Sequence, residues 1–274
     1  MNGTRSPAVA GQFYSGTREG LIRQVEECFR HRIGPGALPP KSPEDGERLR
    51  GGVAPHAGLM YSGPVAAHLY WEIARTGTPE TYVIIGPNHS GYGSAVALST
   101  MDFSTPLGVM RRDVELCGVL ANNGVTEDDV AHGFEHSLEV QLPFIQYINP
   151  NARIVALCMG DQSHRAAVKL GERIRKAAEG RHMMIIASTD FSHYVPPEDA
   201  KRLDSMAVEA ILSHDTKQLD DVVHHHHISM CGYGPVMAML EAVQPKGSKL
   251  LRYATSGDIA PMREVVGYAA IAAW

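Results

Sequence analysis

The stretch TYVIIGPNHSG, residues 81–91, joins a short apolar run to a polar turn and decides how the chain is interpreted. The run 81–86 carries no charged residue and has the length of a strand, which is typical of a strand buried on both faces of a sheet. It leads directly into the turn 87–91, which contains His89. A buried strand that ends in a polar turn predicts an α/β protein with its ligand site at the carboxyl ends of the strands.

Further strand-like and helix-like segments alternate around this stretch. Short apolar runs predict strands over 51–55, 94–99, 152–158, 182–188, 250–255 and 264–272. Amphipathic or capped segments predict helices over 17–32, near 64–75, and over 111–122, 137–148, 163–179, 197–213 and 235–243. A surface loop rich in proline and glycine is expected over 33–50. We therefore predict one α/β domain over residues 1–274, with three layers (α/β/α) and a central sheet that is mostly parallel or mixed.

The composition excludes several classes of protein. With 274 residues, 44% hydrophobic and 20% charged, the chain is not a disordered, collagenous or coiled-coil protein. A net charge of −5 argues against binding to nucleic acid or to a membrane surface. No signal-like N-terminus is present, and no apolar run approaches the roughly 18 residues of a membrane span. The 4 cysteines form no CxxC pair, so we expect a reducing, cytoplasmic location.

Polar turns that contain histidine follow three of the predicted strands. His56 lies in PHAG, His89 in GPNHSG, and both Asp190 and His193 lie in STDFSHY. If these strands are parallel, the three turns meet at one edge of the sheet. A single loop histidine is usually a surface residue, but three in equivalent positions predict a site. Histidine is the commonest metal ligand and acts as an acid or base near neutral pH.

Two further motifs each leave two interpretations open. EHSLE, residues 135–139, is either a helix-capping box with an incidental histidine or a segment that places His136 at the pocket wall. In SMCGYGP, residues 229–235, Cys231 precedes a helix whose N-terminus lowers a thiol pKa, or it is a small buried residue in a tight turn. The run HHHH at 224–227 is interpreted as a solvated helix end, because adjacent histidines on a helix point in different directions.

The ordered motifs resemble one known family, the Memo family, which includes the AmmeMemoRadiSam system protein B of archaea and bacteria. The similarity covers essentially the whole chain. The matching segments are SPAVAGQFY (6–14), APHAGLMYSGPVAA (54–67), IIGPNHSGYG (84–93), STPLGV (104–109), EHSLEVQLPFIQY (135–147), ASTDFSHY (187–194), SMCGYGPV (229–236), TSGD (255–258) and VVGYAAIA (265–272).

This resemblance implies a fold like that of the class III extradiol dioxygenases, which hold non-haem iron(II) with two histidines and a glutamate. Carried over by motif, it implies that His56 and His89 are metal ligands and that Cys231 is the third. Thiolate in place of carboxylate shifts the preference toward copper(I), zinc or iron–thiolate chemistry. Iron(II) is therefore the expected cofactor, with copper or zinc as alternatives.

The same resemblance implies that His193 acts as acid or base, with Asp190 and His136 in the same pocket. It also implies a functional link to radical-SAM and AMMECR-type proteins.

Three functions stay open on the sequence. The first is a metal-dependent oxygenase or redox enzyme acting on an unknown small-molecule or peptide substrate. The second is a metal-dependent hydrolase that uses a metal-bound water. The third is a non-catalytic protein that binds a metal ion or a phosphopeptide.

Overall fold

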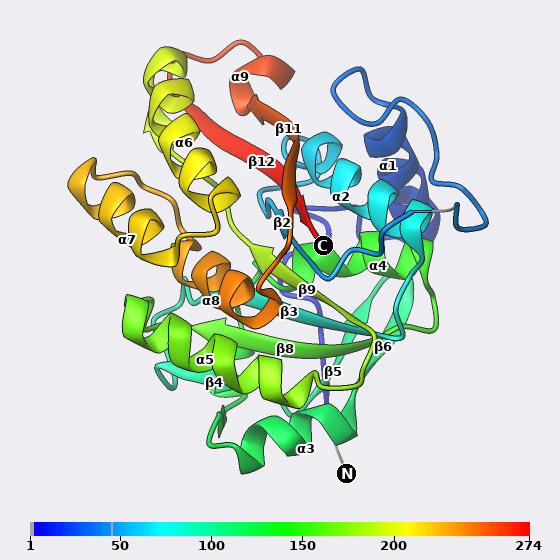
Figure 1. Cartoon of the computed structure of the whole chain (residues 1–274). Coiled ribbons are helices and arrows are strands. Elements are labelled where there is room, and N and C mark those ends of the chain that lie inside the picture. The colour runs from blue at the N-terminus through cyan, green and yellow to red at the C-terminus, as the bar shows by residue number, and fades with distance from the viewer. Residues whose placement is uncertain (1–2, 45) are drawn as a thin grey trace.

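The computed structural model describes residues 3–44 and 46–274 (Figure 1). In this part of the chain, 12 strands form one mixed sheet whose main path runs β1-β5-β6-β8-β3-β9-β2-β12-β10. The strands are β1 (Thr4–Arg5), β2 (Gly51–Ala54), β3 (Thr81–Pro87), β4 (Val96–Leu98), β5 (Asp102–Thr105), β6 (Gly108–Arg112), β7 (Thr126–Glu127), β8 (Arg153–Met159), β9 (Met183–Ser188), β10 (His193–Val195), β11 (Ser248–Thr255) and β12 (Val265–Ala273).

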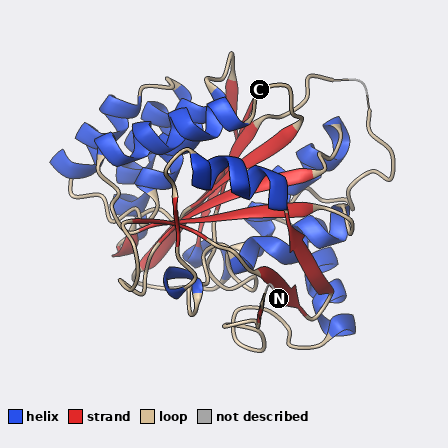
Figure 2. Cartoon of the chain, turned by 90° about the horizontal axis from the view of Figure 1, so that it is seen from below, coloured by secondary structure: helices blue, strands red, loops and turns tan. Residues whose placement is uncertain are grey.

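Helices cover both faces of this sheet (Figure 2). They are α1 (Arg18–Arg30), α2 (Gly63–Thr76), α3 (Val114–Asn122), α4 (Leu142–Ile148), α5 (His164–Ala177), α6 (Pro197–Leu212), α7 (Thr216–His225), α8 (Tyr233–Val243) and α9 (Ser256–Ile259), with 3₁₀ turns η1 (Val130–His132) and η2 (Glu139–Gln141). None of the helices in the described residues has the length and apolar character needed to span a bilayer.

Strand β3 shows why the fold has three layers. All of its residues are buried, and successive side chains point to opposite faces. Tyr82 and Ile84 belong to one hydrophobic core, together with side chains of α1, α2 and α4. Val83 and Ile85 belong to the other core, with side chains of α3 and α5 to α8. The predicted α/β/α arrangement is therefore confirmed.

The centre of the sheet is parallel, and antiparallel pairs lie toward both ends of it. Strands β2, β9, β3 and β8 run parallel to one another, whereas β12 pairs antiparallel with β2, β10 and β11, and β5 pairs antiparallel with β6. Parallel strands place their carboxyl ends at the same edge, which is where a ligand site is expected in this class of sheet. The prediction of a mostly parallel or mixed sheet holds in the mixed form.

Most predicted elements are present, and the differences have local causes. Helix α1 begins after Thr17, whose hydroxyl accepts from the backbone N–H of Gly20 at 3.2 Å, as its sequence indicated. The helix predicted over 111–122 is wrong at its start, because residues 111–112 belong to β6 and Asp113 caps α3. The short strands β1, β5, β6, β7 and β10 were not predicted, since two to five residues carry too little periodicity. Of helix α7, which has ten residues, only the histidine-rich end was predicted as helical.

Candidate metal centre

Three parallel strands bring the histidine-bearing turns to one edge of the sheet. Strand β2 ends at Ala54, which pairs with Ser188, the last residue of β9. Strand β3 lies on the other side of β9 and runs in the same direction. The turns that carry His56, His89 and His193 follow these strand ends, as the sequence predicted from the parallel arrangement.

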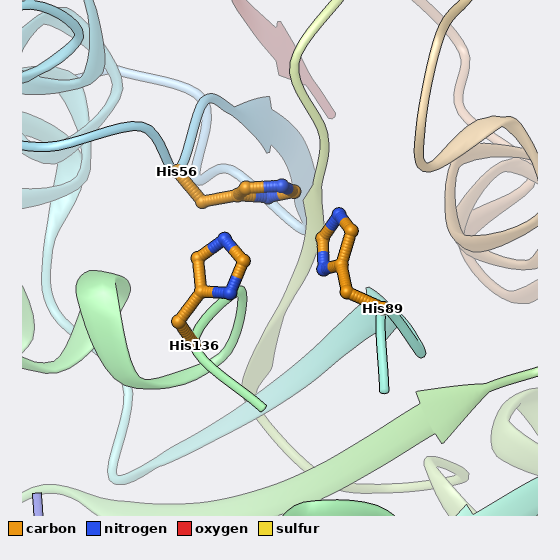
Figure 3. Close-up of side chains that lie close together, drawn as sticks. All are labelled: His56, His89 and His136. Atoms are coloured by element: carbon orange, nitrogen blue, oxygen red, sulfur yellow. The ribbon is translucent and has the colours of Figure 1, made fainter. Parts of the chain in front are cut away.

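His56, His89 and His136 form a compact group, hereafter the three-histidine cluster. One ligand nitrogen from each ring lies within 4.8 Å of the other two. The ring centroids are 5.2 Å apart for His56 and His89, 5.4 Å for His56 and His136, and 4.6 Å for His89 and His136. Figure 3 shows the three rings facing one another from three different segments. The structure thus groups His136, rather than Cys231, with the two predicted histidine ligands.

Hydrogen bonds around Ser188 fix the tautomer of the His56 ring. The Ser188 hydroxyl donates its one proton to the carbonyl of Ser137 at 2.6 Å. It therefore accepts from His56 Nδ1 at 2.9 Å and from Gln141 Nε2 at 2.7 Å. The Gln141 amide is oriented in turn by Tyr70, whose hydroxyl donates to Gln141 Oε1 at 2.6 Å. His56 consequently carries its proton on Nδ1 and presents an unprotonated Nε2.

The fully buried carboxylate of Glu135 orients His89. Glu135 Oε1 accepts from His89 Nδ1 at 2.9 Å and from the backbone N–H of Ser137 at 2.8 Å, and Oε2 accepts from the backbone N–H of His89 at 2.6 Å. Desolvation acts to raise the pKa of Glu135, but these hydrogen bonds and the charge of His89 outweigh it and lower that pKa to about 2. Carboxylates that accept from a ligand histidine in this way fix its ring for metal binding.

The ring of His136 is held by packing. It stacks on His89 with an interplanar angle of 24°, and the ring of Phe13 meets it edge-on at 4.9 Å. Its Nδ1 lies 3.6 Å from Glu135 Oε1, too far for a good hydrogen bond. Desolvation lowers the pKa of His136. Desolvation also holds the pKa of His56 well below its usual value, and the charges of His136 and His89 lower it further. His56 and His136 are therefore neutral, which is the form that binds metal ions. Desolvation acts to lower the pKa of His89 as well, but the hydrogen bond and the charge of Glu135 outweigh it and raise that pKa.

Cys231 lies beside the cluster and contacts His56 directly. Its Sγ is 3.3 Å from His56 Nε2 and accepts from the backbone N–H of Asp190 at 3.2 Å. The thiol has two acceptors within reach, the unprotonated Nε2 of His56 and the carbonyl of Asp190 at 3.6 Å. Desolvation, followed by the charge of Asp190, raises the pKa of the Cys231 thiol. The expectation that the N-terminus of α8 lowers this pKa is therefore wrong, because desolvation outweighs the helix dipole.

Asp190 lies on the loop after β9, and His193 is the first residue of β10. Asp190 Oδ1 accepts from the backbone N–H groups of His56 (2.8 Å) and Ala57 (3.4 Å), so it holds the turn that carries His56. Desolvation of this buried carboxyl raises its pKa to about 6. His193 Nδ1 donates to the carbonyl of Ser229 at 2.7 Å, and its backbone N–H donates to Ser229 Oγ at 2.7 Å. A neutral His193 ring thus has its lone pair on Nε2.

Exposed apolar side chains lie close in sequence to the histidines of the site. The large hydrophobic residues Met60, Tyr92, Phe134 and Tyr194 each lie within four residues of His56, His89, His136 or His193 in the sequence, and all four are exposed. Tyr194 is 74% exposed and has φ 55° at a register shift between β10 and β12. Irregular strands with a strained residue of this kind are found beside functional sites, where the irregularity redirects a side chain.

Sequence reasoning missed the residues that orient the rings of His56 and His89, namely Glu135, Ser188 and Gln141. The helix-capping interpretation of EHSLE is wrong, because α4 begins at Leu142 without a side-chain cap. Ser188 and Gln141 carry no local signal, since they meet His56 only through the fold. The histidine run at the end of α7 is exposed or half-buried, which confirms the predicted solvated helix end.

The three-histidine cluster is separate from a cavity of 690 Å³ at the opposite edge of the sheet. That cavity is lined by residues at the amino ends of β3, β8 and β9, among them Thr81, Arg153 and Met183. None of its lining residues belongs to the cluster. The cavity lies at the amino ends of the strands, and the three-histidine cluster lies at their carboxyl ends.

Comparisons with known proteins agree with the resemblance seen in the motifs. A model of the family described as Memo-like protein matches residues 5–272. The MEMO1 family protein MK0963 of Methanopyrus kandleri is 48% identical over 97% of this chain and 98% of its own length, and MEMO1 family protein MTH_45 of Methanothermobacter thermautotrophicus is 45% identical over the same shares. The crystal structure of the uncharacterized protein JW3007 from Escherichia coli K12 covers 82% of this chain and 99% of its own, with a TM-score of 0.54 and 12% identity. This last likeness concerns the fold alone.

Proposed function

The chain belongs to the Memo-like protein family, and we propose that it is a metal-dependent oxygenase or redox protein acting on a small-molecule or peptide substrate at the three-histidine cluster. The observation that carries the proposal is the meeting of three imidazoles from three separate turns, with ligand nitrogens within 4.8 Å of one another. Burial and mutual repulsion favour the neutral form of His56 and His136, whereas His89 would give up a proton on binding a divalent cation, since Glu135 raises its pKa.

The donor set fits a first-row transition metal. His56 and His89 each have Nδ1 committed to a protein acceptor, so each neutral ring offers Nε2 as ligand. His136 is the third ligand in this assignment. The sequence prediction of Cys231 as third ligand stays as the competing assignment, since Sγ is 3.3 Å from His56 Nε2. Imidazoles suit iron, copper and zinc alike, and the family resemblance favours iron(II).

The other residues around the cluster would bind the substrate or transfer its protons. Bound iron(II) supplies the one-electron chemistry that lets dioxygen react with an organic substrate. His193, with Nδ1 committed to the Ser229 carbonyl, takes a substrate proton at Nε2. Asp190 acts through the backbone of His56 and keeps its turn in place. The exposed side chains of Phe134 and Tyr194 give an organic ligand apolar surface to contact.

One observation favours a second function, a metal-dependent hydrolase. Three histidines are also a donor set of catalytic zinc sites, where the metal lowers the pKa of a water molecule to near 7. In that case His193 would accept a proton from the water. The two functions differ in the metal they tolerate, because zinc does not change oxidation state.

An oxygen electrode distinguishes the two functions. Protein purified without oxygen is loaded with iron(II) or with zinc and given a panel of catechols, phenols and peptides, and separately a panel of esters and phosphoesters. We expect substrate-dependent oxygen uptake with iron, none with zinc, and loss of uptake in His193→Ala at unchanged iron content. Turnover of the ester panel by the zinc form would favour the hydrolase. Stoichiometric metal binding with no turnover of either panel would leave a non-catalytic binding protein.

The cytoplasmic location and the link to radical-SAM and AMMECR-type proteins stay predictions that follow from the cysteine usage and the family resemblance.

A further inference from the structure

We propose that Arg5 and Glu139 form a buried clamp that makes the N-terminal segment, residues 5–14, a working part of the metal site. In this proposal both are positioning residues, and they act by holding the segment that carries His136. The inference rests on the proposed function, because His136 is taken as a metal ligand. It goes beyond it by assigning a role to a segment more than a hundred residues away in the sequence.

The first half of the clamp is the guanidinium of Arg5. This side chain is buried, and Arg5 as a whole is only 4% exposed. It donates to the carbonyls of His132 and Glu135 and to Glu139 Oε2, each at 2.6 Å. All three acceptors lie in residues 132–139, the segment that contains His136. A planar fork of this kind fixes three points at once, which the single ammonium of lysine does not reproduce.

The second half of the clamp is the carboxylate of Glu139, which is fully buried. Besides Arg5, it accepts from three groups of the N-terminal segment. Oε2 accepts from the backbone N–H of Ala8 at 2.8 Å, and Oε1 accepts from the backbone N–H of Val9 at 3.0 Å and the hydroxyl of Tyr14 at 2.6 Å. The two segments are therefore tied to each other in both directions, and neither charge is left unpaired.

The clamp reaches the metal site through Phe13. Its ring meets His136 edge-on, with the ring centroids 4.9 Å apart. Its carbonyl accepts from the backbone N–H of Leu59 at 2.7 Å, in the loop that follows His56. Among the described residues no hydrogen bond fixes the His136 ring, so its orientation depends on the rings packed against it, those of Phe13, His89 and His56. Loosening the N-terminal segment would therefore loosen one ligand of the three.

The test compares cobalt(II) binding by the whole chain and its variants. Cobalt(II) takes the same donors as iron(II) and zinc, and its visible absorption reports the geometry of the ligands. Arg5→Lys keeps the charge but loses the fork, and Glu139→Gln keeps one acceptor. We expect cobalt affinity to fall about 10- to 100-fold in both, as for other partners that orient ligands, with changed visible bands. Phe13→Leu leaves both clamp residues in place and is expected to show the same effect more weakly.

Leu170→Ala is the matched control. Leu170 is buried in α5 within the opposite core, so its truncation lowers the stability of the fold without changing a contact of the site. It is expected to keep the affinity and the spectrum of the parent. The clamp is refuted if folded Arg5→Lys, Glu139→Gln and Phe13→Leu all bind cobalt like the parent.

A second readout keeps the test independent of the metal. In the metal-free proteins, the ring nitrogen NMR signals of His136 are expected to shift in Arg5→Lys but not in Leu170→Ala. Phe13→Leu is left out of this readout, because removal of an aromatic ring beside His136 shifts these signals by itself. If the parent binds no cobalt, the metal function fails, while these signals still decide the clamp: unchanged signals refute it and shifted signals support it.

Discussion

His56 Nδ1 lies 2.9 Å from Ser188 Oγ, an oxygen whose only proton is already given to the carbonyl of Ser137. The ring nitrogen is therefore the donor and the hydroxyl oxygen the acceptor, so the lone pair of the His56 ring is on Nε2 in the metal-free protein. The last residue of β9 thereby sets the chemistry of a histidine more than a hundred residues earlier in the chain.

The first prediction concerns this contact. Ser188→Ala removes the acceptor of His56 Nδ1 and of Gln141 Nε2, leaving buried donors unpaired. We expect a loss of stability of about 1–3 kcal/mol and a 10- to 100-fold loss of metal affinity. Ser99→Ala is the control, since Ser99 is an equally buried serine that donates to Asp129 instead. Urea unfolding and metal titration measure both effects, and equal metal affinity in the two variants would contradict the tautomer assignment.

The second prediction is a pH dependence of stability that arises from Glu135. Its pKa is lowered from 4.5 to about 2 in the folded protein, so its carboxylate stabilises the fold above pH 4.5. That stabilisation, on the order of 3 kcal/mol, is lost as the pH falls toward 2. We expect Glu135→Gln to be less stable than the parent at pH 6, with a difference that shrinks at pH 3. Leu170→Ala, which removes no titratable group, supplies the control, and its difference from the parent is expected to be similar at the two pH values. A Glu135→Gln difference that is independent of pH would be inconsistent with the lowered pKa.

The third prediction concerns the strained backbone at Tyr194. Glycine adopts φ 55° without steric cost, whereas alanine, like the tyrosine present, is strained there. The Tyr194 side chain is exposed, so neither substitution removes core packing. We therefore expect Tyr194→Gly to be more stable than Tyr194→Ala by about 1 kcal/mol. Chemical denaturation of the two variants provides the comparison, and an alanine variant as stable as the glycine variant would show that no strain is present.

The fourth prediction tests how closely the strand and the site segment approach each other. A Cβ at Gly86 would lie 2.3 Å from Ser137 Oγ and 3.0 Å from Leu138 Cδ2. Gly86→Ala should therefore displace the segment beside His136, lowering both stability and metal affinity. Gly118 lies within α3 and a Cβ there meets nothing within 4 Å, so Gly118→Ala should stabilise the fold by about 0.5–1 kcal/mol. Thermal unfolding of both variants checks the two signs, and a Gly86→Ala variant as stable as the parent would argue against the close contact.

Patterns within short windows were enough to predict the layers and the edge of the sheet where the site lies. The apolar run of β3 and the helical spacing of α1 are local signals, and the carboxyl-edge rule then places His56, His89 and His193 together. The third histidine of the cluster was harder to predict from the sequence. His136 was expected in the pocket on the motif resemblance, while the residue pattern alone left an ordinary helix cap as an equal interpretation.

The orienting groups could not be predicted because they depend on contacts between distant segments. Glu135 is next to His136 in sequence but orients His89, and Ser188 meets His56 through strand register. For Cys231 the sequence left two interpretations open, and the one with a lowered thiol pKa is not the one seen, for a similar reason. The helix dipole is visible in the sequence, whereas the desolvation that outweighs it exists only in the folded site.

The ligand set is tested most directly by equilibrium dialysis of iron(II) without oxygen, comparing the parent with His56→Ala, His89→Ala, His136→Ala and Cys231→Ser. We expect one equivalent of iron in the parent, no tight binding in the three histidine variants, and weakened but retained binding in Cys231→Ser. Full retention in His136→Ala with loss in Cys231→Ser would replace the three-histidine assignment with the two-histidine, one-cysteine set. Equal binding by all five proteins, or by none, would remove the metal centre from this edge of the sheet.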